Sequence, residues 1–285
     1  MDVKIRGGSE SDAPVIGRIC YEAFRAIANE HNFPPDIPNA KTGIGAVSHM
    51  LAHPGFYGVV AELDGRIVGS NFLDERDTIA GLGPITVDPQ VQNHGVGRHL
   101  MIALIEHSRR RGFPGLRLVQ AGYHCRSLSL YSKLGFEVRE HLSCMQGPAI
   151  HEAVTGCAVR RATADDMDAC NRLCLAVHGH QRAGELRDAV QQGTARVVER
   201  AGHITGYTTQ IAFFAHAVAE TNDDLEALIG AAESFAGPGF LMPSRNGVLM
   251  RWCLGHGLRV IQPMTLMTMG LYNEPAGAYL PSILY

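Results

Sequence analysis

The residues with the clearest chemical meaning lie in a glycine-rich loop and in a later segment that carries one tyrosine. The loop reads Gln92-Asn93-His94-Gly95-Val96-Gly97, and the later segment spans residues 130–136 and contains Tyr131. A helix that starts at this loop would present unpaired N–H groups and the positive end of its dipole, and both attract anions. Gly95 and Gly97 lack a Cβ, so a phosphate can approach the backbone closely. The loop therefore predicts a pyrophosphate site, and a plain tight turn is the alternative.

The flanking residues predict a strand before this loop and a helix after it. The strand is indicated by three β-favouring residues between prolines, Ile85, Thr86 and Val87. Apolar residues then recur at helical spacing, at Leu100, Met101, Leu104 and Ile105. We expect the helix to begin within residues 93–98. It should end at Gly112, after three arginines that oppose the helix dipole.

Two other phosphate-binding motifs are excluded by the residues present. A dinucleotide fingerprint needs Gly-x-Gly-x-x-Gly after the first strand, but position 100 is Leu100 and earlier strands precede the loop. A nucleoside-triphosphate loop needs Gly-Lys-Ser/Thr, which this segment lacks.

The order and spacing of the loop and the tyrosine segment resemble the GCN5-related N-acetyltransferase (GNAT) superfamily. Its pyrophosphate signature is Gln/Arg-x-x-Gly-x-Gly/Ala, which corresponds here to residues 92–97. The resemblance covers residues 4–145 with both motifs, and residues 158–285 at the level of the fold alone. It implies an α/β protein of two tandem GNAT-like domains, each with a mixed, mostly antiparallel central sheet flanked by helices.

The resemblance implies acetyl transfer from acetyl-coenzyme A, as co-substrate, to a primary amine by direct attack in a ternary complex. In the family, the pantetheine arm pairs with the fourth strand where that strand splays from the fifth; we expect that strand over residues 81–87. Tyr131 would protonate the leaving thiolate, a role that suits a phenol of pKa about 10. A core aromatic packed with Leu128 and Leu134 is the alternative. The resemblance assigns coenzyme A contacts to Ile85, Thr86, Val87, Gln92, Asn93, His94, Gly95, Val96, Gly97, Arg98, His124 and Ser127. His124 stands where the family commonly has Asn.

The general base is left open by the sequence. Many relatives use a glutamate on the fourth strand, but the corresponding position here is near Gly81. The nearby candidates are Asp74, Glu75 and Asp77 in the preceding turn, and Glu22, Glu30 and His31 on the substrate side. We interpret each as a solvated surface charge rather than a base. A water chain and the C-terminal carboxylate of Tyr285 are further candidates.

Composition narrows the class of protein. The chain has 285 residues, 46% of them hydrophobic and 19% charged, as expected for globular domains. The net charge of -3 gives no reason to expect nucleic acid or an anionic membrane as partner. Seven cysteines without a Cys-x-x-Cys motif favour reduced thiols and a cytoplasmic protein. The pairs His49/His53 and His178/His180 lack a third ligand at matching spacing, so we expect no metal site.

The chain repeats itself, which predicts two domains of one fold. Three pairs of segments match: residues 5–12 with 159–166, 59–69 with 197–206, and 134–138 with 256–260. The expected division is a coenzyme-binding domain over residues 1–146, a linker over 147–157 and a degenerate domain over 158–285.

The second copy departs from the pattern where chemistry would occur. Its expected central strand, residues 211–219, is followed by Glu220-Thr221-Asn222-Asp223-Asp224, with no glycine motif. These acids would repel a pyrophosphate, although they would cap a helix well. The position of Tyr131 falls on Cys253. We therefore expect the second copy to complete a substrate pocket, to mediate a homodimer or to stabilise the first copy.

Two further segments bear on the acceptor. Residues 32–39 contain three prolines and should form a rigid loop between the substrate-side helices. The tail, residues 278–285, is too apolar to remain in water, so we expect it to dock at the domain interface or the first-half cleft. The sequence does not name the acceptor and leaves open a small-molecule amine, an aminoglycoside-like antibiotic, or a peptide or protein amine. It also leaves open a non-catalytic acyl-coenzyme A sensor or, as a weaker alternative, a scaffold that binds no coenzyme.

Overall fold

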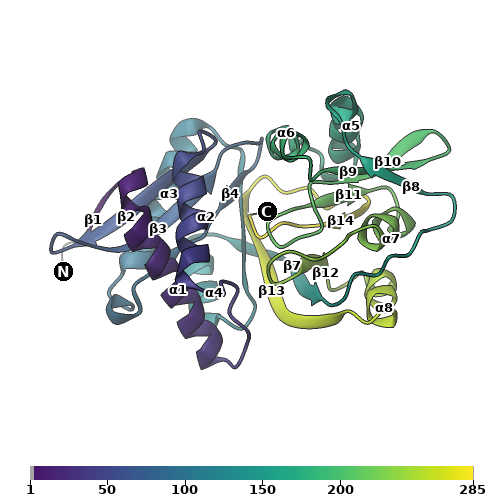
Figure 1. Ribbon diagram of the computed structural model, residues 1–285. Helices are drawn as coiled ribbons and strands as arrows, with labels where there is room; N and C mark the ends of the chain where they lie inside the picture. Colours follow the sequence, from purple (N-terminus) through teal and green to yellow (C-terminus); the bar gives the residue numbers. More distant parts are fainter. Residues whose placement is uncertain (1–2, 285) are drawn as a thin grey trace.

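The computed structural model describes residues 3–284 and shows two halves, each built on strands with helices against them (Figure 1). The first half contains β1 (Val3–Gly7), α1 (Ala13–Glu30), α2 (Ala40–Ala52), β2 (Phe56–Leu63), β3 (Arg66–Asp74), β4 (Ala80–Leu82), β5 (Thr86–Val87), α3 (Val96–Arg111), β6 (Gly115–Ala121), α4 (Cys125–Lys133) and β7 (Glu137–Gln146). The second half contains β8 (Ala158–Arg161), α5 (Met167–His178), α6 (Ala183–Gln192), β9 (Arg196–Arg200), β10 (His203–Thr208), β11 (Ala217–Ala219), α7 (Asn222–Gly230), β12 (Phe240–Pro243), α8 (Gly247–Gly255), β13 (Arg259–Gly270) and β14 (Ala278–Leu280). The α/β class is confirmed.

Alternating side chains divide the core of each half into two layers. On β2, Val59 and Ala61 pack with α3 and α4, whereas Val60 between them packs with α1 and α2. On β9, Val197 packs with α5 and α6, and Val198 packs with α7. Successive strand residues point to opposite faces, so each half covers both faces of its sheet with helices.

The two halves share strands. The larger sheet runs β1-β2-β3-β4-β6-β13-β7-β12, with β5 paired to β3, and the smaller runs β14-β11-β10-β9-β8. Strand β13 of the second half thus lies between β6 and β7 of the first, antiparallel to both. In Figure 1 this long strand crosses the middle of the molecule, where the described end of the chain also lies. The division at residues 147–157 stays a prediction, because the hydrogen-bonded sheet continues across it.

The expected fourth strand is interrupted. Residues 81–87 do not form one strand: β4 ends at Leu82, β5 begins at Thr86, and a cis Gly83–Pro84 bond and Ile85 lie between them. Pro84 has no N–H to give to a ladder. Within residues 3–284, β4 pairs with β6 only at Ala80 and Gly81, and β5 pairs only with β3. The sheet therefore opens between β5 and β6.

The internal repeat is confirmed at the level of individual hydrogen bonds. Arg6 binds both oxygens of Asp12 and also binds Glu62, and Arg160 binds Asp166 and Glu199 in the same way. Asp12 and Asp166 also close equivalent capping boxes with Ser9 and Thr163. Both hairpins turn through two positive-φ residues, Asp64-Gly65 and Ala201-Gly202.

Asp166→Asn is expected to destabilise the protein by about 1–2 kcal/mol at pH 7. Hydrogen bonds from Arg160 lower the pKa of Asp166 from 3.8 to about 2. That shift corresponds to about 2.4 kcal/mol, which we reduce because Arg160 is partly exposed. The contribution of this ion pair to the free energy of unfolding is fully present above pH 4 and is lost as the pH falls towards 2. Denaturant unfolding at pH 7 and pH 2.5 checks this. The exposed neighbour Asp165→Asn is the control, and equal losses in both variants would contradict the prediction.

One expected boundary is confirmed and one was wrong. The helix after the glycine loop begins at Val96, within the expected residues 93–98, because Asn93 and Gly95 before it both adopt left-handed conformations. The expected strand at residues 211–219 is reduced to β11, because residues 209–216 turn back on themselves through Thr209 N–H to His216 O at 2.9 Å. None of the helices within residues 3–284 is long and apolar enough to cross a membrane.

Candidate functional site

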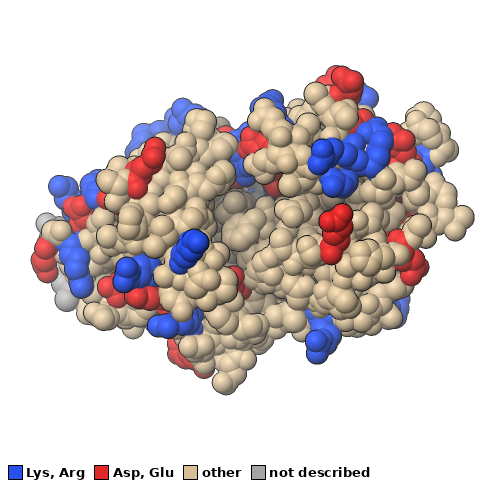
Figure 2. All heavy atoms as spheres, viewed as in Figure 1, with Lys and Arg blue, Asp and Glu red and all other residues tan. Residues whose placement is uncertain are grey.

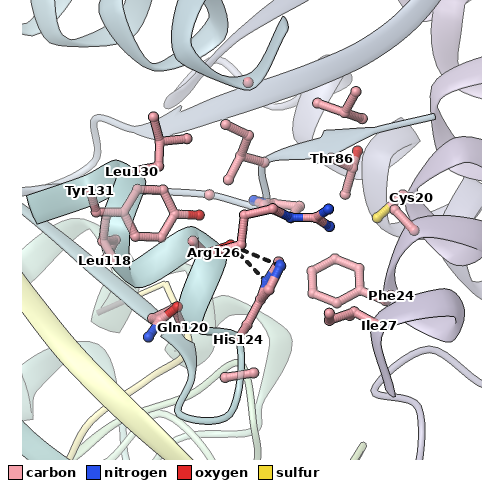
Figure 3. A pocket seen from close by; sticks show the side chains of 18 of the residues that line it. Cys20, Phe24, Ile27, Thr86, Leu118, Gln120, His124, Arg126, Leu130 and Tyr131 are labelled. Carbon is pink, nitrogen blue, oxygen red and sulfur yellow. Dashed lines mark hydrogen bonds between the residues drawn. The ribbon is translucent and has the colours of Figure 1, made fainter. Parts of the chain in front are cut away.

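A cavity of about 710 Å³ opens where the sheet splays, between α1, β4–β5, β6 and α4. Tyr131 and Leu118 lie on one side of it, and Cys20, Phe24 and Ile27 of α1 lie on the other (Figure 3). This volume is within the usual range of small-molecule sites. The expected coenzyme contacts that line it are Ile85, Thr86, Val87, Gln92, Asn93, Gly95, Val96, Gly97, Arg98, His124 and Ser127, together with Tyr131. His94 is not among the lining residues.

One end of the cavity is the N-terminus of α3. Gly95 is the N-cap of this 16-residue helix, with φ of 82°, and Gly97 follows in its first turn. A Cβ placed on Gly97 would lie 3.7 Å or more from its neighbours, so both glycines leave the backbone open. The N–H groups of the first turn lack partners within the helix and can bind an anion.

The loop before α3 is held in shape by side chains. Gln92 donates from Nε2 to Val87 O at 3.1 Å and accepts from Arg126 at 2.6 Å, and Arg126 also reaches Asn93 Oδ1. Arg126 therefore places a cation next to the helix start. His94 instead turns its Nδ1 to Gln92 O, at 2.9 Å.

The middle of the cavity has unpaired polar groups that fit an amide-bearing chain. β5 forms a ladder with β3, and within the described chain no strand pairs with its other edge. Gln120 of β6 is 6% exposed and lines the cavity, yet neither its Oε1 nor its Nε2 has a hydrogen-bond partner. A buried amide without partners costs about 1–3 kcal/mol, so these groups suit a ligand with its own donors and acceptors.

Tyr131 lies at the inner side of the cavity, on α4. Burial raises its pKa to about 12, while the adjacent Ser127 hydroxyl acts in the opposite direction. The phenol therefore keeps its proton at neutral pH and can donate it. The ring also packs in the core cluster of the first half, so the core position and the cavity position are compatible.

His124 and Ser127 form a hydrogen-bonded pair beside Tyr131. His124 Nδ1 lies 2.6 Å from Ser127 Oγ, one helical turn before the tyrosine (Figure 3). Burial, with Arg126 and His31 nearby, lowers the pKa of His124 to about 4, so the imidazole is neutral at pH 7. His124, Ser127 and Tyr131 can thus relay a proton along one face of α4.

Three of the acids considered as bases have structural partners elsewhere, and the interpretation of Asp74 and Asp77 as solvated surface charges was wrong. Asp74 is buried and pairs with Arg76. Glu75 accepts from His107. Asp77 accepts from the N–H groups of Gly184 and Glu185 at the start of α6. None of the three lines the cavity, and Asp77 joins the first half to the second through its hydrogen bonds to α6.

The tail occupies the space next to the fourth strand. Ile283 donates its N–H to Phe213 O at 2.9 Å, and a Cβ on Gly81 would lie 1.9 Å from Leu284 O. Ile283 and Leu284 both line the cavity, which confirms that the tail docks at the first-half cleft. Tyr285, whose carboxylate was a candidate base, lies outside the described residues.

Asp36 is a carboxylate that the sequence reasoning missed. It sits in the loop between α1 and α2, lines the cavity and accepts a hydrogen bond from Gln262 of β13 at 2.6 Å. Burial raises its pKa to about 6, against the opposing effect of Gln262. Arg126, Gln120 and Phe214 were missed as well. Only Arg126 had a local signal, as a cation in the segment before Tyr131.

The second half has the same chain path but no equivalent site. Phe136 N–H binds Tyr131 O, and Leu258 N–H binds Cys253 O in the same way, so Cys253 does stand where the tyrosine would be. At the start of α7, Thr221 and Asp224 form a capping box. Side-chain oxygens therefore occupy the helix N-terminus that an anion would need. Among residues 3–284, no three His, Cys, Asp or Glu side chains are grouped to hold a metal ion.

Comparison with known proteins agrees with this geometry. Residues 20–136 match the acetyltransferase (GNAT) family model. A mycothiol acetyltransferase from Brachybacterium faecium is 34% identical over 100 residues, which cover 32% of this chain and 30% of that protein. The chain spans less than a third of the length of the curated relatives that it matches.

Two solved structures share the fold along nearly the whole chain. A GCN5-related N-acetyltransferase from Sphaerobacter thermophilus is 16% identical with a TM-score of 0.63, covering 95% of this chain and 96% of that one. A tandem GNAT protein from the clavulanic acid biosynthesis pathway is 14% identical with a TM-score of 0.56, covering 99% and 100%. At this identity they show the fold, and they confirm the tandem arrangement.

Proposed function

We propose that the chain, whose residues 20–136 match the acetyltransferase (GNAT) family model, transfers an acetyl group from acetyl-coenzyme A to a primary amine. The observation that carries the proposal is one continuous cavity that runs from the N-terminus of α3 to Tyr131. A pyrophosphate and a thioester at the two ends of one extended chain would occupy those positions together. The curated relatives are mycothiol acetyltransferases by name, which supports the reaction class.

The chain's own residues would hold the coenzyme at three places. The first-turn N–H groups of α3, with Arg126 and Arg98, would bind the pyrophosphate. The open edge of β5 at Thr86 and Val87 would pair with the pantetheine amides as an added strand does. Gln120 would take the remaining donor and acceptor.

Tyr131 is proposed as the general acid for the leaving thiolate. Burial raises the pKa of its phenol to about 12, so the protonated form is fully present at neutral pH. The proton goes to sulfur as the C–S bond breaks, and Ser127 with His124 provides a route for its replacement.

The second half is proposed to lack a coenzyme site and to shape the acceptor side of the first. Asp224 is fully buried and is bound by Thr205, Arg200 and Thr221, so it cannot move aside for an anion. The division into residues 1–146, 147–157 and 158–285 accords with this role.

Acetyl-coenzyme A is expected to raise the melting temperature, and Gly95→Glu is expected to abolish the shift. At a hundredfold excess over Kd the ligand stabilises by about 2.7 kcal/mol. That corresponds to about 5–10 °C for a chain of this size. A glutamate at the N-cap puts a negative charge where the pyrophosphate would lie. Thermal unfolding with and without ligand is the measurement.

Gly112→Glu is the matched control, because Gly112 has φ of 78° at the other end of the same helix and no neighbour within 4 Å. It carries the same left-handed strain and charge but should keep the ligand-induced shift. No shift in the unaltered protein at millimolar acetyl-coenzyme A would contradict the proposal. A shift without coenzyme A release for any amine would favour the sensor.

A further inference from the structure

The second half supplies an apolar wall to the cavity of the first. Phe213 and Phe214 reach it from the turn at residues 209–216, and Ile283 reaches it from the tail. Phe24 and Ile27 of α1 lie across the cavity from Tyr131 and Leu118 (Figure 3). Figure 2 shows this face hollowed between the two halves, with mostly uncharged atoms at the floor of the hollow.

Phe214 is the exposed member of this wall. Its side chain is 53% exposed and packs edge-on to the buried Phe213, with ring centroids 5.6 Å apart. The turn that presents it is held by Thr209 N–H to His216 O and by Ile283 N–H to Phe213 O. A large aromatic fixed at the rim of a cavity is suited to cover the apolar body of a ligand.

Charge is distributed unevenly along the cavity. The lining cations, Arg98, Arg126 and Lys133, all belong to α3 and α4, which carry the proposed phosphate site. The two lining carboxylates, Glu30 and Asp36, belong to the α1 side, and Glu30 is exposed. Asp36 is thus the one shielded negative group along the cavity wall within residues 3–284.

The Asp36 carboxylate is held in place by a hydrogen bond to one of its two oxygens. Its Oδ1 accepts from Gln262, and within the described chain Oδ2 accepts no hydrogen bond. The titratable groups that face it are neutral thiols and a phenol: Cys20 of α1, Cys144 of β7 and Tyr123 before α4. A ligand with one hydrogen-bond donor at this point would supply the missing hydrogen bond to Oδ2.

The position used by the fourth-strand glutamate of similar proteins is closed in this chain. Any side chain on Gly81 would meet Leu284 O, so no carboxylate can stand there while the tail is docked. Asp36 approaches the cavity from the loop between α1 and α2 instead.

We propose that the acceptor is a monoamine on an apolar body, with its ammonium at Asp36 and its body against Phe213, Phe214 and Ile283. This rests on the proposed acetyl transfer. One shielded carboxylate matches one ammonium, whereas a polyamine or an aminoglycoside would leave further charges against an apolar wall.

Asp36 then acts as the base. The ammonium gives one proton to Asp36, and the free amine attacks the thioester carbon. As the N–C bond replaces the C–S bond, a second proton leaves the nitrogen for solvent and the thiolate takes one from Tyr131. Solvent restores Tyr131 and deprotonates Asp36, so each turnover releases one proton. Because the pKa of Asp36 is about 6, kcat/KM should rise with pH up to that value.

The test measures coenzyme A release by the full chain with 2-phenylethylamine, hexylamine, spermidine and kanamycin. We expect kcat/KM for the two apolar monoamines to exceed that for the other two at least tenfold. Phe214→Ala should raise the KM for 2-phenylethylamine about tenfold and leave the KM for acetyl-coenzyme A unchanged. Leu254→Ala, a similarly exposed residue of the second half outside the cavity, should change neither.

Asp36→Asn should lower kcat/KM about a hundredfold at pH 7 and remove the acid limb near pH 6. Glu30→Gln, on the rim of the same cavity, should cost less than threefold. A preference for spermidine or kanamycin, or a larger loss from Glu30→Gln than from Asp36→Asn, overturns the inference. In either case the thermal shift with acetyl-coenzyme A remains. Its absence would instead overturn the proposed function.

Discussion

Tyr131→Phe is expected to lower kcat by about a hundredfold or more and to leave the KM for acetyl-coenzyme A within twofold. General-acid catalysis contributes about 10²- to 10⁴-fold, and this substitution removes the hydroxyl that would donate the proton and that interacts with Ser127. The ring keeps its packing against Phe136, 6.3 Å away between centroids, so the fold should hold. Steady-state coenzyme A release with saturating amine checks the result, and a thermal shift checks that binding is preserved.

Tyr57→Phe serves as the control for this prediction. Tyr57 also packs against the first-half core and stacks on His107, but it does not line the cavity. Removal of the Tyr57 hydroxyl should leave kcat unchanged. If Tyr131→Phe also left kcat unchanged, Tyr131 would be only a core aromatic, and another donor would protonate the thiolate.

The residues of the proposed coenzyme side could be grouped from the sequence because they are close along the chain. Gly95 and Gly97 stand within one turn of the helix they start, and His124, Ser127 and Tyr131 share one face of α4. Glycine spacing and helical period are properties of neighbouring residues, so they can be read along the chain. The repeat was visible for the same reason, since each capping box lies within four residues.

The acceptor side could not be predicted, because its parts meet only in three dimensions. Asp36 and Gln262 are separated by 226 positions, and Gly81 meets Leu284 across most of the chain. Residues 211–216 resemble strand residues in type, and the turn that presents Phe214 depends on hydrogen bonds to His216 and the tail. The insertion of β13 between β6 and β7 likewise follows from pairing between distant strands, which side-chain alternation alone does not specify.

The interruption of the fourth strand connects these two sides. The sheet opens after Gly81, so one edge of β5 is left where we propose that the coenzyme binds, and the same opening lets the tail approach β4. The cavity is therefore bounded by both copies of the fold even though one copy carries the glycine loop. Under the proposed function, the second copy would contribute to the acceptor side of the site without a coenzyme site of its own.

Deleting residues 279–285 is expected to prevent stable folding, whereas Gly81→Ala is expected to displace the tail alone. The deletion removes most of β14, which pairs with β11, and takes away the buried Tyr279, Leu280 and Ser282. Burial of two large apolar side chains and a strand edge accounts for about 5 kcal/mol, comparable to the stability of a domain. Soluble yield and thermal unfolding measure this loss.

Gly81→Ala tests the contribution of the tail to the cavity wall without disrupting the fold. The new Cβ would lie 1.9 Å from Leu284 O and displace that residue, while β14 stays in place. The variant should raise the KM for an apolar amine about tenfold, keep the acetyl-coenzyme A shift and make the C-terminus more accessible to carboxypeptidase. Gly7→Ala, also in a strand but with no neighbour within 4 Å, should behave as the unaltered protein. If the deletion of residues 279–285 folds and acetylates normally, the tail has no part in the acceptor site.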